Sequence, residues 1–137
     1  MKWQDTMNLI RLFQERSNDI IADAEKALTR AHLKNYEAVG PQRVRLRIDT
    51  LYEHTVRSVE EKKLTPMRAY AENIARKRFE SGYDLMEVQT AFNVVEEAIW
   101  LRIMKELPPA QLGGALGLVS TVLMPSVSPW WIMSSAA

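Results

Sequence analysis

The stretch "GYDLMEVQTAFNVVEEAIWLRIM", residues 82–104, decides the fold class of this chain. Its apolar residues recur every three or four positions, which is the spacing that gathers side chains on one face of an α-helix. The first stripe, typical of the buried face of a core helix, consists of Leu85, Val88, Phe92, Val95 and Ile99. The sequence therefore predicts a helix that begins near Leu85 and ends before Pro108.

A second apolar stripe widens this helix on an adjoining face. A helix with two apolar faces is either central to its domain or meets a partner on one of them. Two-fold dimers are the commonest assemblies, and a dimer face resembles a halved core, so we expect both central packing and a symmetric contact. The predicted dimer interface consists of Ala91, Val94, Ala98, Trp100, Leu101 and Met104.

Helical spacing also governs the rest of the chain, which gives five or six helices in all. The only period-two alternation, "RVRLRI" at residues 43–48, fits the surrounding helix equally well, so we predict an all-α bundle. Three local signals set boundaries: a break at Ser17 and Asn18, a hydroxyl cap at Thr65 before Pro66, and a left-handed stop at Gly82. Asp84 with Glu87 is similar to a capping box for the helix that follows.

Composition predicts a cytoplasmic chain that is neither bound to nucleic acid nor inserted in a membrane. Lys and Arg number 18 against 17 Asp and Glu, and the two clusters of basic residues carry no aromatic stacking platform. Charged residues interrupt the apolar positions of the N-terminus, which argues against a signal peptide. Prolines and glycines break the weakly polar stretch from Leu107 to Ala137, so it does not predict a spanning helix.

The sequence predicts no catalytic residue, no cofactor and no metal site. There is no cysteine, and the two histidines, His32 and His54, lack a carboxylate three residues before them or a second histidine four residues after. Glu96 and Glu97 point about 100° apart on a helix, so they cannot flank one substrate as a glycosidase pair does. We therefore expect a protein that is not an enzyme.

The final segment, "MPSVSPWWIMSSAA" at residues 124–137, differs from everything before it. It contains two prolines, four serines and adjacent tryptophans, and it carries no charge. Two interpretations stay open: the segment is foreign to the domain, or it is a natural apolar tail packed on the domain. We accordingly assign residues 1–123 to one helical sensory and dimerisation domain, followed by an irregular tail.

The stretch "YAENIARKRFESGYDLMEVQTAFNVVEEAIWLRI", residues 70–103, resembles the N-terminal domain of RsbR-type co-antagonist proteins, the RsbRD N-terminal family. With weaker helical correspondence the resemblance covers about residues 9–123. The matching positions are packing and capping residues: Ala71, Ile74, Ala75, Arg78, Gly82, Leu85, Glu87, Ala91, Glu97, Ala98 and Ile99.

The resemblance implies a globin-like helical fold that binds no haem, usually dimeric, placed as an input module before an output domain such as a STAS domain or a kinase. It implies no catalytic residue. This chain departs from that plan because no output domain follows residue 123, so we expect either a stand-alone regulator or a fragment whose partner is a downstream regulatory protein. The alternative is a globin-like sensor that holds haem or another apolar molecule in its helical core, with His54 or His32 as the ligand.

Overall fold

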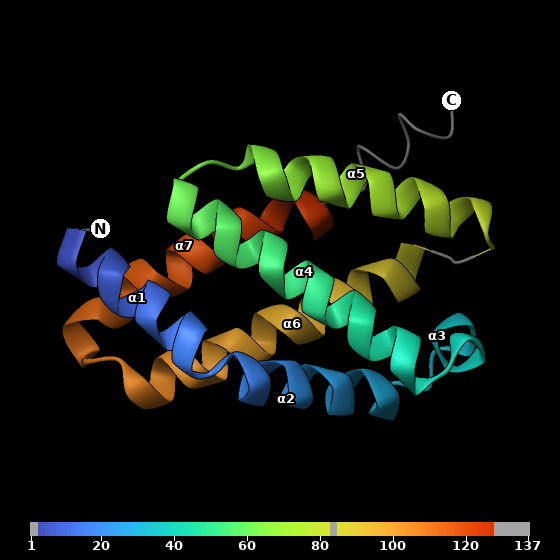
Figure 1. Ribbon diagram of the computed structural model, residues 1–137, viewed down its shortest axis with the longest axis horizontal. Coiled ribbons are helices and arrows are strands. Elements are labelled where there is room, and N and C mark those ends of the chain that lie inside the picture. Colours follow the sequence, from blue (N-terminus) through green and yellow to red (C-terminus); the bar gives the residue numbers. More distant parts are fainter. Residues whose placement is uncertain (1–2, 83–84, 128–137) are drawn as a thin grey trace.

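The computed structural model describes residues 3–82 and 85–127, and all of its regular structure in these ranges is α-helical (Figure 1). The predicted all-α class is confirmed. The helices are α1 (Trp3–Glu15), α2 (Ser17–Arg30), α3 (Lys34–Val39), α4 (Pro41–Glu61), α5 (Thr65–Glu80), α6 (Leu85–Glu106) and α7 (Pro109–Val127). There are seven described helices where the sequence predicts five or six.

The additional helix is α3, and its two ends explain why the sequence pattern does not indicate it. His32 before it adopts a φ of 51°, and Gly40 after it adopts a φ of 89° with a ψ of 160°. A helix of six residues is too short to display the three-and-four periodicity of a longer stripe. The predicted break between the first two helices is confirmed, and it lies at Arg16, one residue before Ser17.

Boundary signals of the remaining helices are correct in part. Gly82 adopts a φ of 94° just after α5, so the predicted left-handed stop is confirmed. The predicted cap at Thr65 is wrong, because Leu64 before it already has helical angles and no side chain caps the helix. Thr65 is instead the first residue of α5. The final helix continues past residue 123 to Val127, and Asp84 lies outside the described residues.

Helix α6 is the central element of the core. Val88, Phe92, Val95, Ile99 and Ile103 are each at most 1% exposed. The helix packs mainly between α2 and α7, and α4 runs in front of it in Figure 1. The predicted stripe of a core helix is therefore confirmed for its described members, and each fully buried side chain of this size contributes about 1.5–3 kcal/mol.

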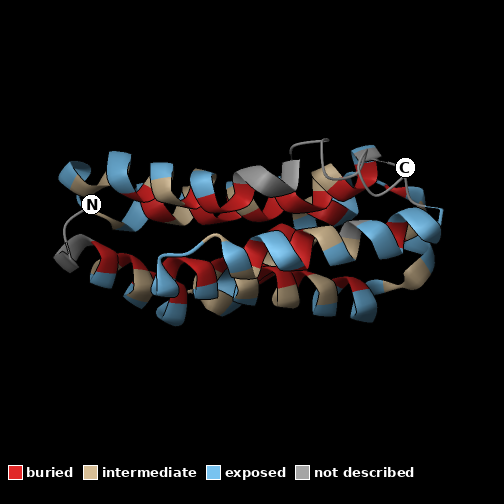
Figure 2. Cartoon of the chain, turned by 90° about the horizontal axis from the view of Figure 1, so that it is seen from above, coloured by how far each residue is buried: buried red, intermediate tan, exposed pale blue. Residues whose placement is uncertain are grey.

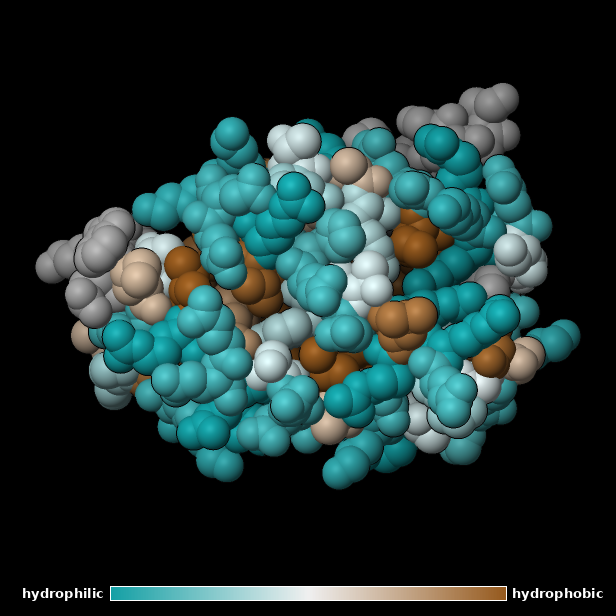
Figure 3. All heavy atoms as spheres, viewed as in Figure 1, coloured by the Kyte–Doolittle hydropathy of each residue, from teal (hydrophilic) through white to brown (hydrophobic). Residues whose placement is uncertain are grey.

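Buried residues line the facing sides of two layers of helices, and exposed residues cover the outer sides (Figure 2). The face shown in Figure 3 is mostly hydrophilic, with separate small hydrophobic spots. Single exposed apolar residues are ordinary on a protein surface. Among the residues whose burial is described, the large hydrophobic ones that remain exposed are Met7, Leu46, Phe79, Met86, Leu101 and Met104.

Candidate interaction surface on helix α6

Three of the six predicted interface residues are covered within a single chain. Ala91, Val94 and Ala98 are only 4%, 8% and 4% exposed. They lie on the side of α6 that packs against α2, where Val94 and Ala98 line a groove between the two helices. The candidate contact surface therefore narrows to the residues of α6 that neither α2 nor α7 covers.

The uncovered side of α6 forms a strip along the whole helix, which we call the outer strip. Its residues follow one another at steps of three and four, so they share one face. They are Met86, Thr90, Asn93, Glu97, Leu101 and Met104. The three apolar members are 63%, 55% and 50% exposed, and they stand at the two ends of the strip with the polar members between them. Met86 is a member that the sequence prediction missed.

Trp100, the remaining predicted interface residue, lies beside the outer strip. Its side chain is half-buried and packs against the hydrophobic core. Its indole Nε1 is buried and has no hydrogen-bond partner within the described part of the chain. A buried donor without a partner lowers stability, so the indole lies here for its apolar contacts.

Next to the outer strip, a surface groove of about 340 Å³ lies between α2 and α6. Its floor is formed by small apolar residues, among them Ala27 and Ala98. Charged side chains from α2 line its edge, namely Asp23, Lys26 and Arg30. Leu101 belongs both to this groove and to the outer strip, so the apolar end of the strip continues into a hollow with charged walls.

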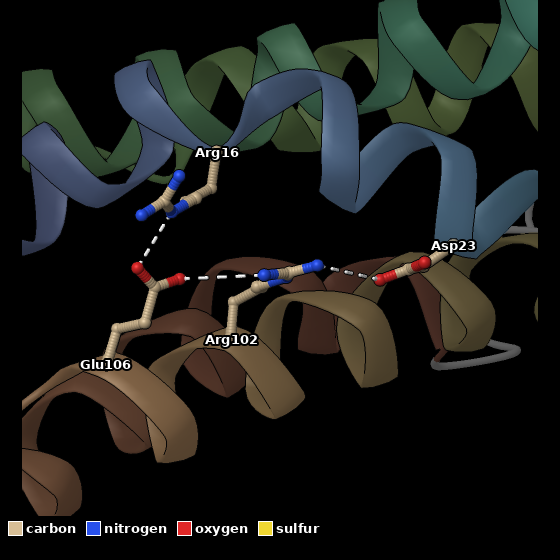
Figure 4. A network of polar contacts seen from close by, with 4 residues as sticks. All are labelled: Arg16, Asp23, Arg102 and Glu106. Carbon is tan, nitrogen blue, oxygen red and sulfur yellow. Dashed lines mark hydrogen bonds and ion pairs between the residues drawn. The ribbon is translucent and has the colours of Figure 1, made fainter.

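A chain of four charged residues ties this end of α6 to the junction of α1 and α2 (Figure 4). Arg16 Nε lies 2.7 Å from Glu106 Oε1, and this hydrogen bond raises the pKa of Arg16. Arg102 lies 3.8 Å from the second oxygen of Glu106 and 3.7 Å from Asp23 on α2. The network connects Arg16, the residue between α1 and α2, with the C-terminal end of α6.

At the other end of α6, buried polar side chains hold the short helix α3. Asn35 donates from Nδ2 to both carboxylate oxygens of Glu87, at 3.1 and 2.9 Å, and Glu87 is only 5% exposed. Arg78 donates to the hydroxyl of Tyr36, and its guanidinium lies 5.2 Å from the centroid of the Tyr36 ring. These contacts connect α3 with α5 and α6.

Arg78, one of the packing and capping positions in the family resemblance, is a buried charged residue of α5. It is 6% exposed, and its Nε has no hydrogen-bond partner within the described residues. The sequence contains a signal for this burial, because Arg78 stands four residues after Ile74 in the apolar stripe of α5 and so points into the core. Burial raises the pKa of nearby Tyr70, and the charge of Arg78 offsets part of that rise.

The two histidines lie apart, one on the surface after α2 and the other beside an open groove. His32 follows α2, its side chain is 79% exposed, and its Nδ1 lies 2.9 Å from Glu37. His54 on α4 stacks on Tyr70 with ring centroids 4.2 Å apart, and its Nδ1–H donates to the carbonyl of Thr50 at 2.9 Å. The hollow beside His54 is an open groove with charged residues along it.

These settings differ from the closed apolar pocket in which proteins hold haem. Across residues 3–82 and 85–127, no group of three or more potential ligands is placed to hold a metal ion. Within the same ranges, no helix is both long enough and apolar enough to cross a membrane.

The central α6, packed between α2 and α7, lies within the part of the chain that matches a known protein family. Residues 19–124 match the family described as the RsbT co-antagonist protein rsbRD N-terminal domain. The chain belongs to this family. No curated protein and no solved structure matches it.

The resemblance seen in residues 70–103 is thereby confirmed, and the matched range agrees with the predicted extent of 9–123 apart from the first helix. The RsbRD N-terminal family is one of regulatory stress-signalling domains that interact with partner regulatory proteins, and it is not a known enzyme family. The matched range contains α6 and therefore the whole outer strip.

Proposed function

We propose that this chain is a cytoplasmic, non-enzymatic signal-input domain that acts through homodimerisation and through contact with a downstream regulatory protein or output domain. The observation that carries the proposal is the outer strip of α6. It exposes Met86, Leu101 and Met104 on one face of the central helix, whereas long apolar side chains on a helix are normally turned toward the core. A protein partner that covers this face removes the exposed apolar area from water.

The spacing of the outer strip suits a second copy of the same helix. In an antiparallel pair related by a two-fold axis near Asn93, Met86 of one copy stands opposite Leu101 of the other. The same register places Thr90 opposite Glu97, so that two polar side chains meet between the apolar ends of the strip. A two-fold contact requires such self-complementarity, because the same patch supplies both sides.

The matching family supports the second half of the proposal. Its members are regulatory domains whose role depends on partner regulatory proteins. Surfaces away from the outer strip remain accessible to such a partner in this dimer, including the mainly hydrophilic face of Figure 3. Dimerisation then fixes how two partner molecules are held relative to each other.

The test replaces Leu101 by lysine and compares the variant with Leu46→Lys. Leu46 is 64% exposed on α4, so it is an equally tolerant site outside the strip. Native mass spectrometry and sedimentation should show a dimer for the wild type and for Leu46→Lys, and a monomer with an unchanged circular dichroism spectrum for Leu101→Lys. Val94 is unsuitable for this test, because it is buried against α2.

A second variant, Met104→Lys, checks the same end of the strip and should weaken the dimer in the same direction. A wild type that stays monomeric at micromolar concentration contradicts the proposal. So does a Leu101→Lys variant that remains dimeric with a native spectrum, because an ammonium group buried in an apolar contact is costly.

A further inference from the structure

A hollow of about 290 Å³ lies between α2, α3 and α4, at the end of the bundle where α3 is held. Its floor is apolar and consists of Leu28, Tyr36 and Val44, which are 3%, 3% and 7% exposed. Two carboxylate side chains, Glu25 and Glu37, stand at its rim. Its size is close to the lower end of the usual range for small-molecule pockets, about 300–1,000 Å³.

The rim of this hollow offers acceptors of hydrogen bonds and negative charge. The guanidinium of Arg45 lies 3.4 Å from the carboxylate of Glu25, and Nδ1 of His32 lies 2.9 Å from that of Glu37. Both pairs are exposed to solvent, so a ligand can replace either of them at little cost. The hydroxyl of Thr29 already donates to the backbone carbonyl of Glu25 and therefore offers no donor to a ligand.

Helix α3 forms one wall of the hollow and depends on contacts with neighbouring helices. It has only six residues, which is too few for a helix to be stable without its neighbours. The positive φ angles of His32 and Gly40 form a sharp corner at each of its ends. Its tethers are the contact of Tyr36 with Arg78 on α5 and that of Asn35 with Glu87 on α6.

We propose that this hollow binds a small organic amine. The apolar body of the amine packs on Leu28, Tyr36 and Val44, and its ammonium group donates to the carboxylates of Glu25 and Glu37. This inference rests on the proposed function, in that the amine is the signal that the regulatory domain receives. Because α3 is tethered to Glu87 at the beginning of α6, occupation of the hollow acts on the helix that carries the outer strip.

The first experiment compares three ligands that share an indole ring and differ in charge: tryptamine, indole and indole-3-propionate. Each is titrated into the full chain at pH 7 by calorimetry, with saturation-transfer NMR to confirm the bound state. Tryptamine should bind at least about tenfold more tightly than indole, the factor expected from one charge-assisted hydrogen bond. Indole-3-propionate should bind most weakly. Equal affinities for the three ligands, or no binding of tryptamine, overturn the proposal.

The second experiment places the amine in the hollow. Glu25→Gln and Glu37→Gln remove the rim charges at partly exposed positions, so both variants should fold. Each should weaken tryptamine about tenfold and leave indole unchanged. Thr29→Phe, at an exposed position of the rim, should block both ligands. Glu60→Gln, exposed near the other end of α4, is the matched control. Tryptamine affinity that is unchanged in all three rim variants overturns the assignment.

Failure of this inference can be distinguished from failure of the proposed function. Binding is measured per subunit, so it does not require a dimer. If the wild type is monomeric and still binds tryptamine through Glu25 and Glu37, the pocket stands and the dimer proposal falls. If the protein is dimeric through Leu101 and tryptamine does not bind, only the pocket assignment falls.

Discussion

At the scale of single residues, Tyr52 completes the end of α1. Its hydroxyl donates to the carbonyl oxygen of Phe13 at 2.7 Å, and the two rings meet edge to face with centroids 5.9 Å apart. Carbonyls in the last turn of a helix lack partners within that helix. A side chain of α4 therefore supplies a hydrogen bond that the break at Arg16 leaves open.

Replacing Tyr52 by phenylalanine keeps the ring and removes this buried hydrogen bond. Because Tyr52 is 4% exposed, the carbonyl of Phe13 then lacks a buried partner, and the free energy of unfolding should fall by about 1–3 kcal/mol. Urea unfolding followed by circular dichroism measures the change. Thr50→Val is the control: its hydroxyl bonds only to Leu46 in its own helix, and the change should stay within about 0.5 kcal/mol.

The loss of stability caused by Tyr52→Phe should depend on pH. The burial of the Tyr52 hydroxyl sets the sign of that dependence. Burial raises the pKa of Tyr52 above its ordinary value of about 10. The folded protein therefore holds this proton at a pH where the unfolded chain releases it, so stability falls as pH rises above about 10. The loss caused by Tyr52→Phe should shrink over that range. A constant difference between pH 7 and pH 11 contradicts this account.

At the scale of elements, Gly40 permits the sharp passage from α3 into α4. Its φ of 89° and ψ of 160° lie in a region that is essentially restricted to glycine. Gly40→Ala should therefore lower the free energy of unfolding by about 1–3 kcal/mol, although nothing lies within 4 Å of the added carbon. Thermal and urea unfolding measure the loss.

Gly113→Ala is the matched control, because it makes the same chemical change inside α7. An added carbon at Gly113 also meets nothing within 4 Å, and the backbone there is helical without a positive φ. Alanine is a better helix former than glycine, so this variant should be more stable by about 0.5–1 kcal/mol. Two losses of equal size would show that conformation is not the cause at Gly40.

At the scale of the whole molecule, one hydrophobic core is shared by helices from both ends of the chain. Phe92 on α6 is 1% exposed and belongs to the same hydrophobic core as buried residues of α2 and α7. Phe92→Ala should lower the free energy of unfolding by about 3–5 kcal/mol, and the transition should remain single. Denaturant unfolding by fluorescence and circular dichroism tests both points.

Phe79→Ala removes the same side chain from α5 at a position that is 44% exposed. Its loss should be smaller, about 1–2 kcal/mol, because this side chain buries less apolar area and leaves no closed cavity. Two separate transitions in either variant, or equal losses in both, would mean that the helices do not share one core.

The candidate surface could be predicted from the sequence only in part. The pattern of residues 82–104 correctly predicts a central helix with surplus apolar area. Leu101 and Met104 are exposed, and their place in an interface stays a prediction. The same pattern does not distinguish Ala98, which α2 covers, from Leu101, which stays open. Helical periodicity gives the direction of a side chain around its own helix, and a neighbouring helix decides whether that direction is covered.

The sequence by itself determined every long helix, several of the helix boundaries and the family, because helical periodicity, the conformation of glycine and the family motifs are local properties of the chain. Tertiary structure alone decided which faces of α6 are covered by α2 and α7. It also brought the buried Arg78 into contact with Tyr36 and made α3 one wall of a hollow with an acidic rim. These features join residues that are distant in the sequence. Hydrophobic attraction is non-directional, so a local sequence pattern does not select which surfaces meet. The packing of whole helices against one another makes that selection.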